Sequence, residues 1–443
     1  MILLIKSIFT NSSGILVSRI LGFIRDLLTA SILGANIYSD IFFVAFKVPN
    51  LFRRIFAEGA FTQAFIPAYA KSKRKISFSS VIFLQFLAFI VILSLLVTLF
   101  ATLVTKAIAI GFDEKTIDLA APLVAINFYY LPLIFIVTFM AALLQYKNHF
   151  ATTAFSTALL NLSLIGALLI SKNMESYEIT FYLSYGVLVG GVLQVLVHLL
   201  AIRKKNLLKV FTFRRNKKKN AEEKSFYKNF LGATMGSSTA HLSAFLDTWL
   251  ASFLITGSIS YLYYANRIFQ LPLALFAIAT SVALFPMIAK SIRNNDNQKA
   301  LRLMRKAFIV LFIVLSIASL IGIIFNEFII TLLFQRGAFT INNSQETAII
   351  LTMYLIGLLP FGLAKIFSLW LYAHEKQFLA AKISIKALIF NIVFSLILIK
   401  PYGASGLAFA STISGFVLFI LTIKEFGYKN FTKMLLKNDS TLN

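Results

Sequence analysis

The sequence predicts an all-α integral membrane protein, with about twelve transmembrane helices in two six-helix bundles. The 443-residue chain is 59% hydrophobic and only 13% charged, whereas an average soluble domain is about 25% charged. Its mean hydropathy is +0.83. Twelve apolar stretches approach or exceed the roughly 20 residues that a helix needs to cross a bilayer. A motif near the end of the second stretch returns in the eighth, which indicates a parallel internal repeat.

The twelve expected spans are separated mostly by short polar loops. In order they cover residues 8–33, 41–70, 78–108, 119–146, 151–171, 179–202, 228–256, 260–289, 304–325, 345–372, 378–399 and 403–424. The first is expected to stay in the mature protein, because it carries two arginines and no small-residue cleavage site follows it. A further apolar run, 328–334, is too short to span and is expected to be re-entrant or interfacial.

Basic residues alternate from loop to loop along the whole chain. Segment 203–228 holds eleven Lys or Arg and segment 290–306 holds six, whereas the loops on the opposite side hold at most one each. Loops rich in Lys and Arg stay in the cytoplasm, so an even number of spans predicts two cytoplasmic termini. This distribution indicates that the net charge of +25 orients the protein in the membrane and attracts anionic membrane lipids. It excludes nucleic acid as a partner.

The repeat predicts where the chain divides. Residues 65–72 (FIPAYAKS) and 284–291 (LFPMIAKS) align at an offset of 219, about half the chain. We therefore expect an N-terminal six-helix bundle at 1–202, a basic cytoplasmic linker at 203–227, a C-terminal six-helix bundle at 228–425 and a basic cytoplasmic tail at 426–443. Transporters built from such repeats bind their substrate between the halves.

Several spans carry arginine at membrane depth, where each charge costs about 3 kcal/mol on insertion scales. These residues are Arg19 and Arg25 in the first span, Arg53 in the second and Arg267 in the eighth. Buried cations with few acids predict a cavity for an anionic substrate, since the guanidinium group holds phosphate or carboxylate oxygens with two hydrogen bonds.

Asp26 is expected to pair with an arginine in the empty site and so to lower its cost. The alternative is a structural ion pair that locks two helices. Other intramembrane polar residues are further candidates for the cavity lining: Asp40, Lys47, Glu58, Asn266 and Lys365.

Other kinds of site have little support in the sequence. The absence of cysteine excludes disulfides and thiolate metal sites, and the four histidines lack metal-ligand spacing. There is no phosphate-binding glycine loop and no GxSxG motif. We therefore expect no enzyme activity, no cofactor and no metal.

Five motifs identify the sequence as similar to a known family. Residues 18–26 (SRILGFIRD), 40–54 (DIFFVAFKVPNLFRR), 57–61 (AEGAF), 263–267 (YYANR) and 333–339 (LFQRGAF) closely resemble the MurJ (MviN) lipid II flippases. The resemblance extends from about residue 8 to about residue 425.

The resemblance implies a polysaccharide-exporter or MATE-like fold. It implies a flippase for lipid II, the undecaprenyl-diphosphate-linked peptidoglycan precursor, moved by alternating access from the inner to the outer leaflet of the bacterial cytoplasmic (inner) membrane. Such a role belongs to cell-wall synthesis and cell shape, with wall-synthesis enzymes as candidate partners and the membrane potential as a candidate driving force. The arginines that match Arg19, Arg25, Arg53 and Arg267 line the family's central cavity, and Asp26 matches a motif position.

The sequence also departs from the family pattern. Family members commonly have two more C-terminal spans, which help form a groove for the lipid tail, whereas this chain ends after the twelfth expected span. Asn266 stands where an acidic residue is usual. Some relatives resemble sodium-coupled carriers, for which Asp247 and Asn391 are the candidate ligands here. Lys382 and Lys386 in the same span as Asn391 argue against such a cation site.

Three alternative functions share parts of this pattern. A flippase for another polyprenyl-linked saccharide would use the same mechanism. A MATE-type drug or cation exporter would need more acidic residues in its cavity. A membrane scaffold for wall-synthesis enzymes would tolerate substitution of the arginines.

Overall fold

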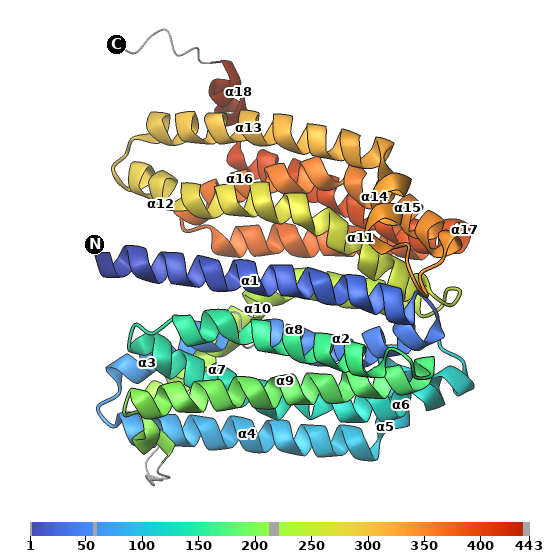
Figure 1. Ribbon diagram of the computed structural model, residues 1–443. Coiled ribbons are helices and arrows are strands. Elements are labelled where there is room, and N and C mark those ends of the chain that lie inside the picture. Colours follow the sequence, from blue (N-terminus) through green and yellow to red (C-terminus); the bar gives the residue numbers. More distant parts are fainter. Residues whose placement is uncertain (1, 56–59, 212–220, 437–443) are drawn as a thin grey trace. The chain divides into compact units, whose positions relative to one another are not determined.

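The computed structural model describes residues 2–55, 60–211 and 221–436. Helices account for nearly all of this part of the chain, and no strand occurs in it. Helices of each half run side by side over much of their length (Figure 1), as apolar helices with fully satisfied backbones do in lipid.

Up to residue 251, the described residues form ten α-helices and one short 3-10 helix. They are α1 (Ile2–Leu33), α2 (Ile37–Ile55), α3 (Phe61–Lys71), α4 (Lys75–Leu99), α5 (Ala101–Ile108), α6 (Glu114–Phe128), α7 (Tyr130–Tyr146), α8 (Ala151–Ser171), α9 (Ser176–Lys204), η2 (Leu208–Phe211) and α10 (Ala221–Ala251).

From residue 258 to residue 436, where the described part ends, there are eight α-helices and a short π-helix. They are α11 (Ser258–Pro272), η3 (Leu273–Ile278), α12 (Ala279–Arg293), α13 (Asn297–Ile324), α14 (Asn326–Phe334), α15 (Ile341–Ile356), α16 (Leu358–Ala373), α17 (Gln377–Phe426) and α18 (Tyr428–Leu436).

These helices follow the expected spans. Each expected span falls on one helix or on consecutive helices, except that residues 56–59 of the second span lie outside the described residues. Eight of the helical segments are long and apolar enough to cross a membrane by length and composition. The 50-residue α17 joins the last two expected spans, which are separated by a kink at Gly403, where φ is 55°. The apolar run at 328–334 lies in the short helix α14.

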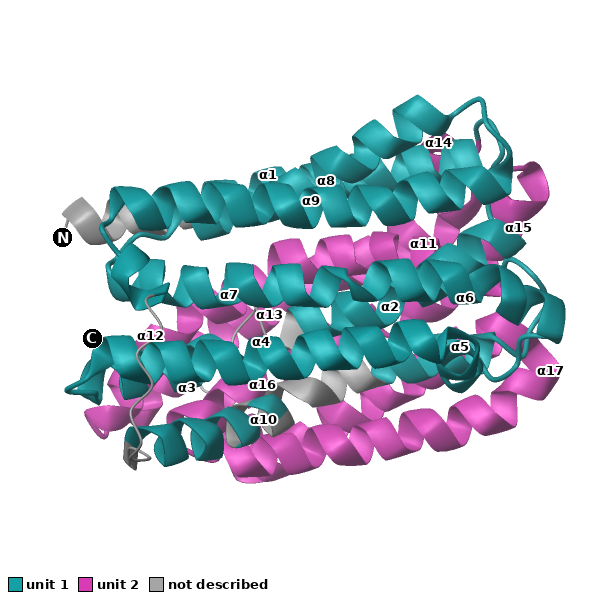
Figure 2. Ribbon diagram, turned by 90° about the horizontal axis from the view of Figure 1, so that it is seen from below, with its two compact units in different colours: residues 1–257, 336–339 teal, residues 258–335, 340–443 magenta. Residues whose placement is uncertain are grey.

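The chain forms two compact units, coloured separately in Figure 2. Unit 1 comprises residues 1–257 and 336–339, and unit 2 comprises residues 258–335 and 340–443. This grouping differs from the expected division at the basic linker, because α10 packs against α2 and α3 of unit 1. Which partners a helix selects depends on tertiary packing, which a hydropathy pattern does not encode.

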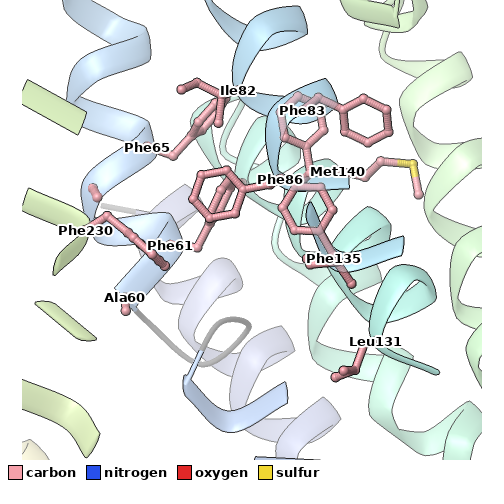
Figure 3. Close-up of a cluster of buried hydrophobic side chains, with 14 of the residues drawn as sticks. Ala60, Phe61, Phe65, Ile82, Phe83, Phe86, Leu131, Phe135, Met140 and Phe230 are labelled. Atoms are coloured by element: carbon pink, nitrogen blue, oxygen red, sulfur yellow. The ribbon is translucent and has the colours of Figure 1, made fainter. Parts of the chain in front are cut away.

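A large aromatic cluster forms the core of unit 1 (Figure 3). The ring centroids of Phe61 and Phe65 are 5.3 Å apart, and Phe61 also meets Phe135 and Phe226 edge-on at 5.7 and 5.6 Å. Phe226 belongs to α10 and Phe61 to α3, so these contacts tie α10 to α3, and Phe61 in turn ties α3 to α7. Such edge-to-face pairs contribute about 0.5–1.5 kcal/mol each beyond their buried area.

Small residues bring three helices of unit 1 into close contact. A Cβ added at Gly186 or Gly190 of α9 would lie 2.9 Å from Ala167 or 2.8 Å from Leu160 of α8. A Cβ at Gly14 of α1 would lie 2.7 Å from Ala154, also on α8. Small residues let helix backbones approach closely in this way, and the contacts place the middle of α1 against α8.

Candidate functional site

Arg25 and Asp26 of α1 form an ion pair within the first expected span. Nη2 and Nε of Arg25 donate to Oδ1 of Asp26 at 2.6 and 3.1 Å. The side chain of Asp26 is 2% exposed and that of Arg25 is 11% exposed. Asp26 therefore neutralises one of the intramembrane arginines, which is the pairing that the sequence predicts.

Asn161 of α8 completes this cluster from a distant part of the chain. Its Oδ1 accepts a hydrogen bond from Nη1 of Arg25 at 3.1 Å, and its Nδ2 donates to the backbone oxygen of Ser18 at 2.9 Å. Gly22 of α1 faces this amide, since a Cβ there would lie 3.4 Å from Asn161 Nδ2, at ordinary van der Waals distance. We define Arg25, Asp26 and Asn161 as the α1–α8 cluster. Sequence analysis missed Asn161, since a buried amide in a span has no signal without its partner.

Arg19 lies outside this cluster. Its side chain is exposed, as are those of its neighbours Leu16 and Ile20. It stands seven residues, about two helical turns, before the buried Asp26. Arg19 is therefore not part of the α1–α8 cluster.

Arg53 has a local partner on α2. Its Nε and Nη2 donate to Oδ1 of Asn50 at 3.2 and 3.1 Å, one helical turn away. Pro49 lies inside the same helix, and Lys47 and Arg53 are both partly buried. Asn50 aligns the guanidinium group without neutralising its charge. Glu58 falls outside the described residues.

Asp40, in the first turn of α2, connects that helix to the loop that follows α10. Its Oδ2 accepts a hydrogen bond at 2.7 Å from the backbone nitrogen of Gly257, whose φ is 93°. Asp40 is 2% exposed. It therefore fixes the end of unit 1, directly before α11 begins.

A four-residue strap, Arg336–Phe339, also belongs to unit 1. The backbone nitrogen of Ala338 donates to the backbone oxygen of Ser31 at 2.7 Å. Gly34 and Gly337 have φ of 75° and 58°, which favour glycine. A Cβ at Gly337 would lie 2.2 Å from the Ser31 oxygen. The strap thus attaches the connection between α14 and α15 to the end of α1.

Arg267 of α11 lies in unit 2 against an aromatic ring. Its Nη2 donates to the Tyr263 hydroxyl at 3.0 Å, and its guanidinium carbon is 5.2 Å from the centre of that ring. The two residues are one turn apart, a spacing at which helical side chains meet. The sequence of residues 263–267 is therefore enough to predict this contact. Asn266 accepts a hydrogen bond from Gln270.

The remaining candidates of unit 2 lie on α16 and α17. Lys365 is exposed on α16, and the Lys382 amine lies 4.9 Å from the centre of the Phe378 ring. Asn391 is buried and donates to the Ser411 hydroxyl at 3.0 Å. Asp247, its expected partner in a sodium site, belongs to unit 1. Within the described part of the chain, no group of three or more His, Cys, Asp or Glu side chains is placed to hold a metal ion.

The structure therefore brings the predicted residues together only in part. Arg25 and Asp26 share a cluster, Arg53 is held separately on α2, and Arg267 is held by Tyr263 in the other unit. A common chamber for the arginines stays a prediction. Each described arginine that has a partner keeps its guanidinium in a fixed orientation, as a site for a phosphate would require.

Known proteins are similar to this one over nearly the whole chain. A family model described as lipid II flippase MurJ matches residues 29–440. The probable lipid II flippase MurJ of Helicobacter pylori (strain J99) is 50% identical over 416 residues, which cover 91% of this chain and 90% of that protein. Its counterpart in Buchnera aphidicola subsp. Baizongia pistaciae is 33% identical over 430 residues, covering 95% and 83%.

Solved structures share the fold. One described as lipid II flippase MurJ in an inward closed conformation has a TM-score of 0.81 at 26% identity, covering 96% of this chain and 89% of that one. An inward-facing multidrug resistance MATE family transporter has a TM-score of 0.76 at 13% identity, covering 96% and 98%.

The helical fold and its intramembrane charges define a multi-pass membrane transporter of the kind that MurJ and MATE proteins share. Within that class the relationship is specific. The chain belongs to the lipid II flippase MurJ family.

Proposed function

We propose that this protein translocates lipid II from the inner to the outer leaflet of the cytoplasmic membrane by alternating access. The family relationship supports the substrate, since the relatives that match over most of their length are named as probable lipid II flippases. The observation that carries the mechanism is the α1–α8 cluster, in which Asp26 and Asn161 hold the Arg25 guanidinium.

In the proposed mechanism, Arg25, Arg53 and Arg267 bind the diphosphate while the prenyl chain remains in lipid. Arg25 is partly exposed and bound to Asp26 at 2.6 Å in the empty protein. A diphosphate competes with the Asp26 carboxylate for the Arg25 guanidinium. The positive charge of Arg25 is therefore balanced by Asp26 before binding and by the diphosphate after it. Arg19, exposed on α1, is proposed to meet the head group at a different stage.

The local partners of the arginines suit a reversible clamp. Asn50 and Tyr263 are neutral, and their hydrogen bonds orient the guanidinium groups of Arg53 and Arg267. Arginine forms two parallel hydrogen bonds with phosphate oxygens, which lysine cannot reproduce. Arg53→Lys and Arg267→Lys are therefore expected to retain less activity than their retained charge suggests.

The orientation and energy source are part of the proposal. The basic loops place both termini in the cytoplasm. An inside-negative potential then favours outward movement of a net negative head group, by about 2.3 kcal/mol per charge per 100 mV.

Complementation of a bacterium depleted of its own flippase tests the clamp. Wild-type protein should restore growth, whereas Arg53→Ala and Arg267→Ala should fail while reaching the membrane in normal amounts. Lys299→Ala is the matched control, because Lys299 is an exposed cation at the start of α13 and should support normal growth. Full growth with both arginine variants would reject the clamp.

A further inference from the structure

A cavity outside the arginine clusters lies wholly within unit 2. Its volume is about 630 Å³, and it is formed by the end of α12 and the turn that follows α16. The residues that decide its chemistry are Phe285, Ala289, Lys290, Arg293, Tyr372 and Glu375. We call it the α12–α16 cavity.

The lining changes from apolar to charged along both helices. On α12, Phe285 precedes Lys290 and Arg293, and Arg293 lies eight positions after Phe285, about 12 Å along the helix at 1.5 Å per residue. On the other wall, Tyr372 precedes Glu375. Phe285 and Tyr372 are 38% and 41% exposed. The cavity therefore presents aromatic surface at one end and charge at the other, as an amphiphilic ligand requires.

The charged end has an excess of positive charge. Lys290 and Arg293 are exposed, and in the described part of the chain neither has an ion-pair partner. Glu375 is the acid at this end, so two permanent cations face one carboxylate. Glu375 also has φ of 60°, a left-handed conformation that costs a non-glycine residue free energy and often marks a functional position.

The corresponding place in the first repeat is filled. Lys75 donates to the Tyr146 hydroxyl at 2.7 Å, and the Tyr146 ring meets the Tyr69 ring at 5.0 Å. Tyr146 lies two residues before Asn148, whose φ of 56° matches that of Glu375.

Smaller side chains stand at the matching positions of the second repeat. Ala373 lies two residues before Glu375, and Ile288 occupies the position after the shared proline that Tyr69 has in the first repeat. Of these two, Ala373 lines the cavity, so the smaller side chain there leaves space at a position where the first repeat has the Tyr146 ring.

We propose that the α12–α16 cavity binds the head group of a membrane phospholipid. Lys290 and Arg293 bind the phosphodiester oxygens, and Phe285 and Tyr372 contact the first part of the acyl chains. A soluble phosphate would use only the charged end. The ordered change from aromatic to basic lining therefore favours a lipid over a free anion, and the site is separate from lipid II transport.

Native mass spectrometry of delipidated full-length protein in detergent tests this proposal, with short-chain phosphatidylglycerol as the probe. The double variant Lys290→Gln/Arg293→Gln should bind the lipid at least about tenfold more weakly than wild type, since each cation near a lipid surface contributes about 1 kcal/mol. The matched control Lys299→Gln/Arg302→Gln removes the same charge from the neighbouring start of α13 and should bind as wild type does. Equal losses in both double variants would overturn the site.

Two further measurements separate the remaining explanations. Glu375→Gln should bind phosphatidylglycerol several-fold more tightly than wild type, a gain that misfolding does not produce; unchanged or weaker binding would contradict the assignment of the cavity. Glycerol phosphate should compete only at concentrations at least 100-fold above those of the lipid. Competition at equal concentrations would replace the lipid with a soluble anion.

Discussion

Replacing Arg25 by alanine removes the cation that neutralises Asp26. Asp26 is 1% exposed, so the carboxyl either keeps its charge without the guanidinium or takes up a proton, and both states are less favourable than the ion pair. Removing one partner of a buried pair typically costs 3–5 kcal/mol, much of it from the charge left behind. We therefore expect Arg25→Ala to lower the free energy of unfolding by about 3 kcal/mol.

The double variant Arg25→Ala/Asp26→Asn separates this stability effect from function. It removes the charge as well as its partner, so it should recover about 2 kcal/mol relative to Arg25→Ala. Unfolding of the purified proteins in mixed micelles, followed by helical circular dichroism, gives the difference. Both variants should fail to complement a flippase-depleted cell. A single variant as stable as the double variant would refute the argument that Asp26 depends on Arg25.

Three further predictions concern the loops. Gly337→Ala places a Cβ 2.2 Å from a backbone oxygen of α1 and should lower the melting temperature. Gly166→Ala is the control and should leave the melting temperature unchanged, because no atom lies within 4 Å of the new Cβ. Equal effects of the two substitutions would contradict the role of the strap. Asp40→Ala should lower the free energy of unfolding by about 1–3 kcal/mol in the same assay, because it leaves the Gly257 amide without its acceptor. Asp40→Asn retains an acceptor and should lose less. Equal losses of stability in the two variants would show that this hydrogen bond does not contribute. Burial, together with two lysines at the end of α9, lowers the pKa of His149. The neutral form of His149 therefore stabilises the fold, fully above the ordinary pKa of about 6.5. This stability is lost as the pH falls through the lowered pKa. His149→Gln should remove that part of the pH dependence of unfolding.

Much of the fold follows from local pattern. Apolar length alone locates the spans, and small residues at Gly186 and Gly190 indicate the close contact of α9 with α8. The grouping of α10 with unit 1 does not follow, because Phe226 meets Phe61 and Phe65 through contacts between distant parts of the chain. No local pattern selects those partners.

The candidate site can likewise be predicted only where its contacts are local in the sequence. An arginine beside an acid in an apolar helix predicts the Arg25–Asp26 pair, and spacing along one helix is enough to explain the partners of Arg53 and Arg267. Asn161 lies 136 residues from Arg25, and Asp40 meets Gly257 across 217 residues. Such contacts depend on how helices and loops pack, so composition and periodicity alone do not reveal them.

Exposure of lipid II at the outer surface tests the proposed function most directly. Cells that depend on this protein would be treated with a toxin that cleaves lipid II only from outside, and the cleaved fraction would be measured before and after depletion. We predict that depletion prevents cleavage and that wild-type protein restores it, whereas the Arg25→Ala/Asp26→Asn variant does not. Undiminished cleavage after depletion would contradict a lipid II flippase.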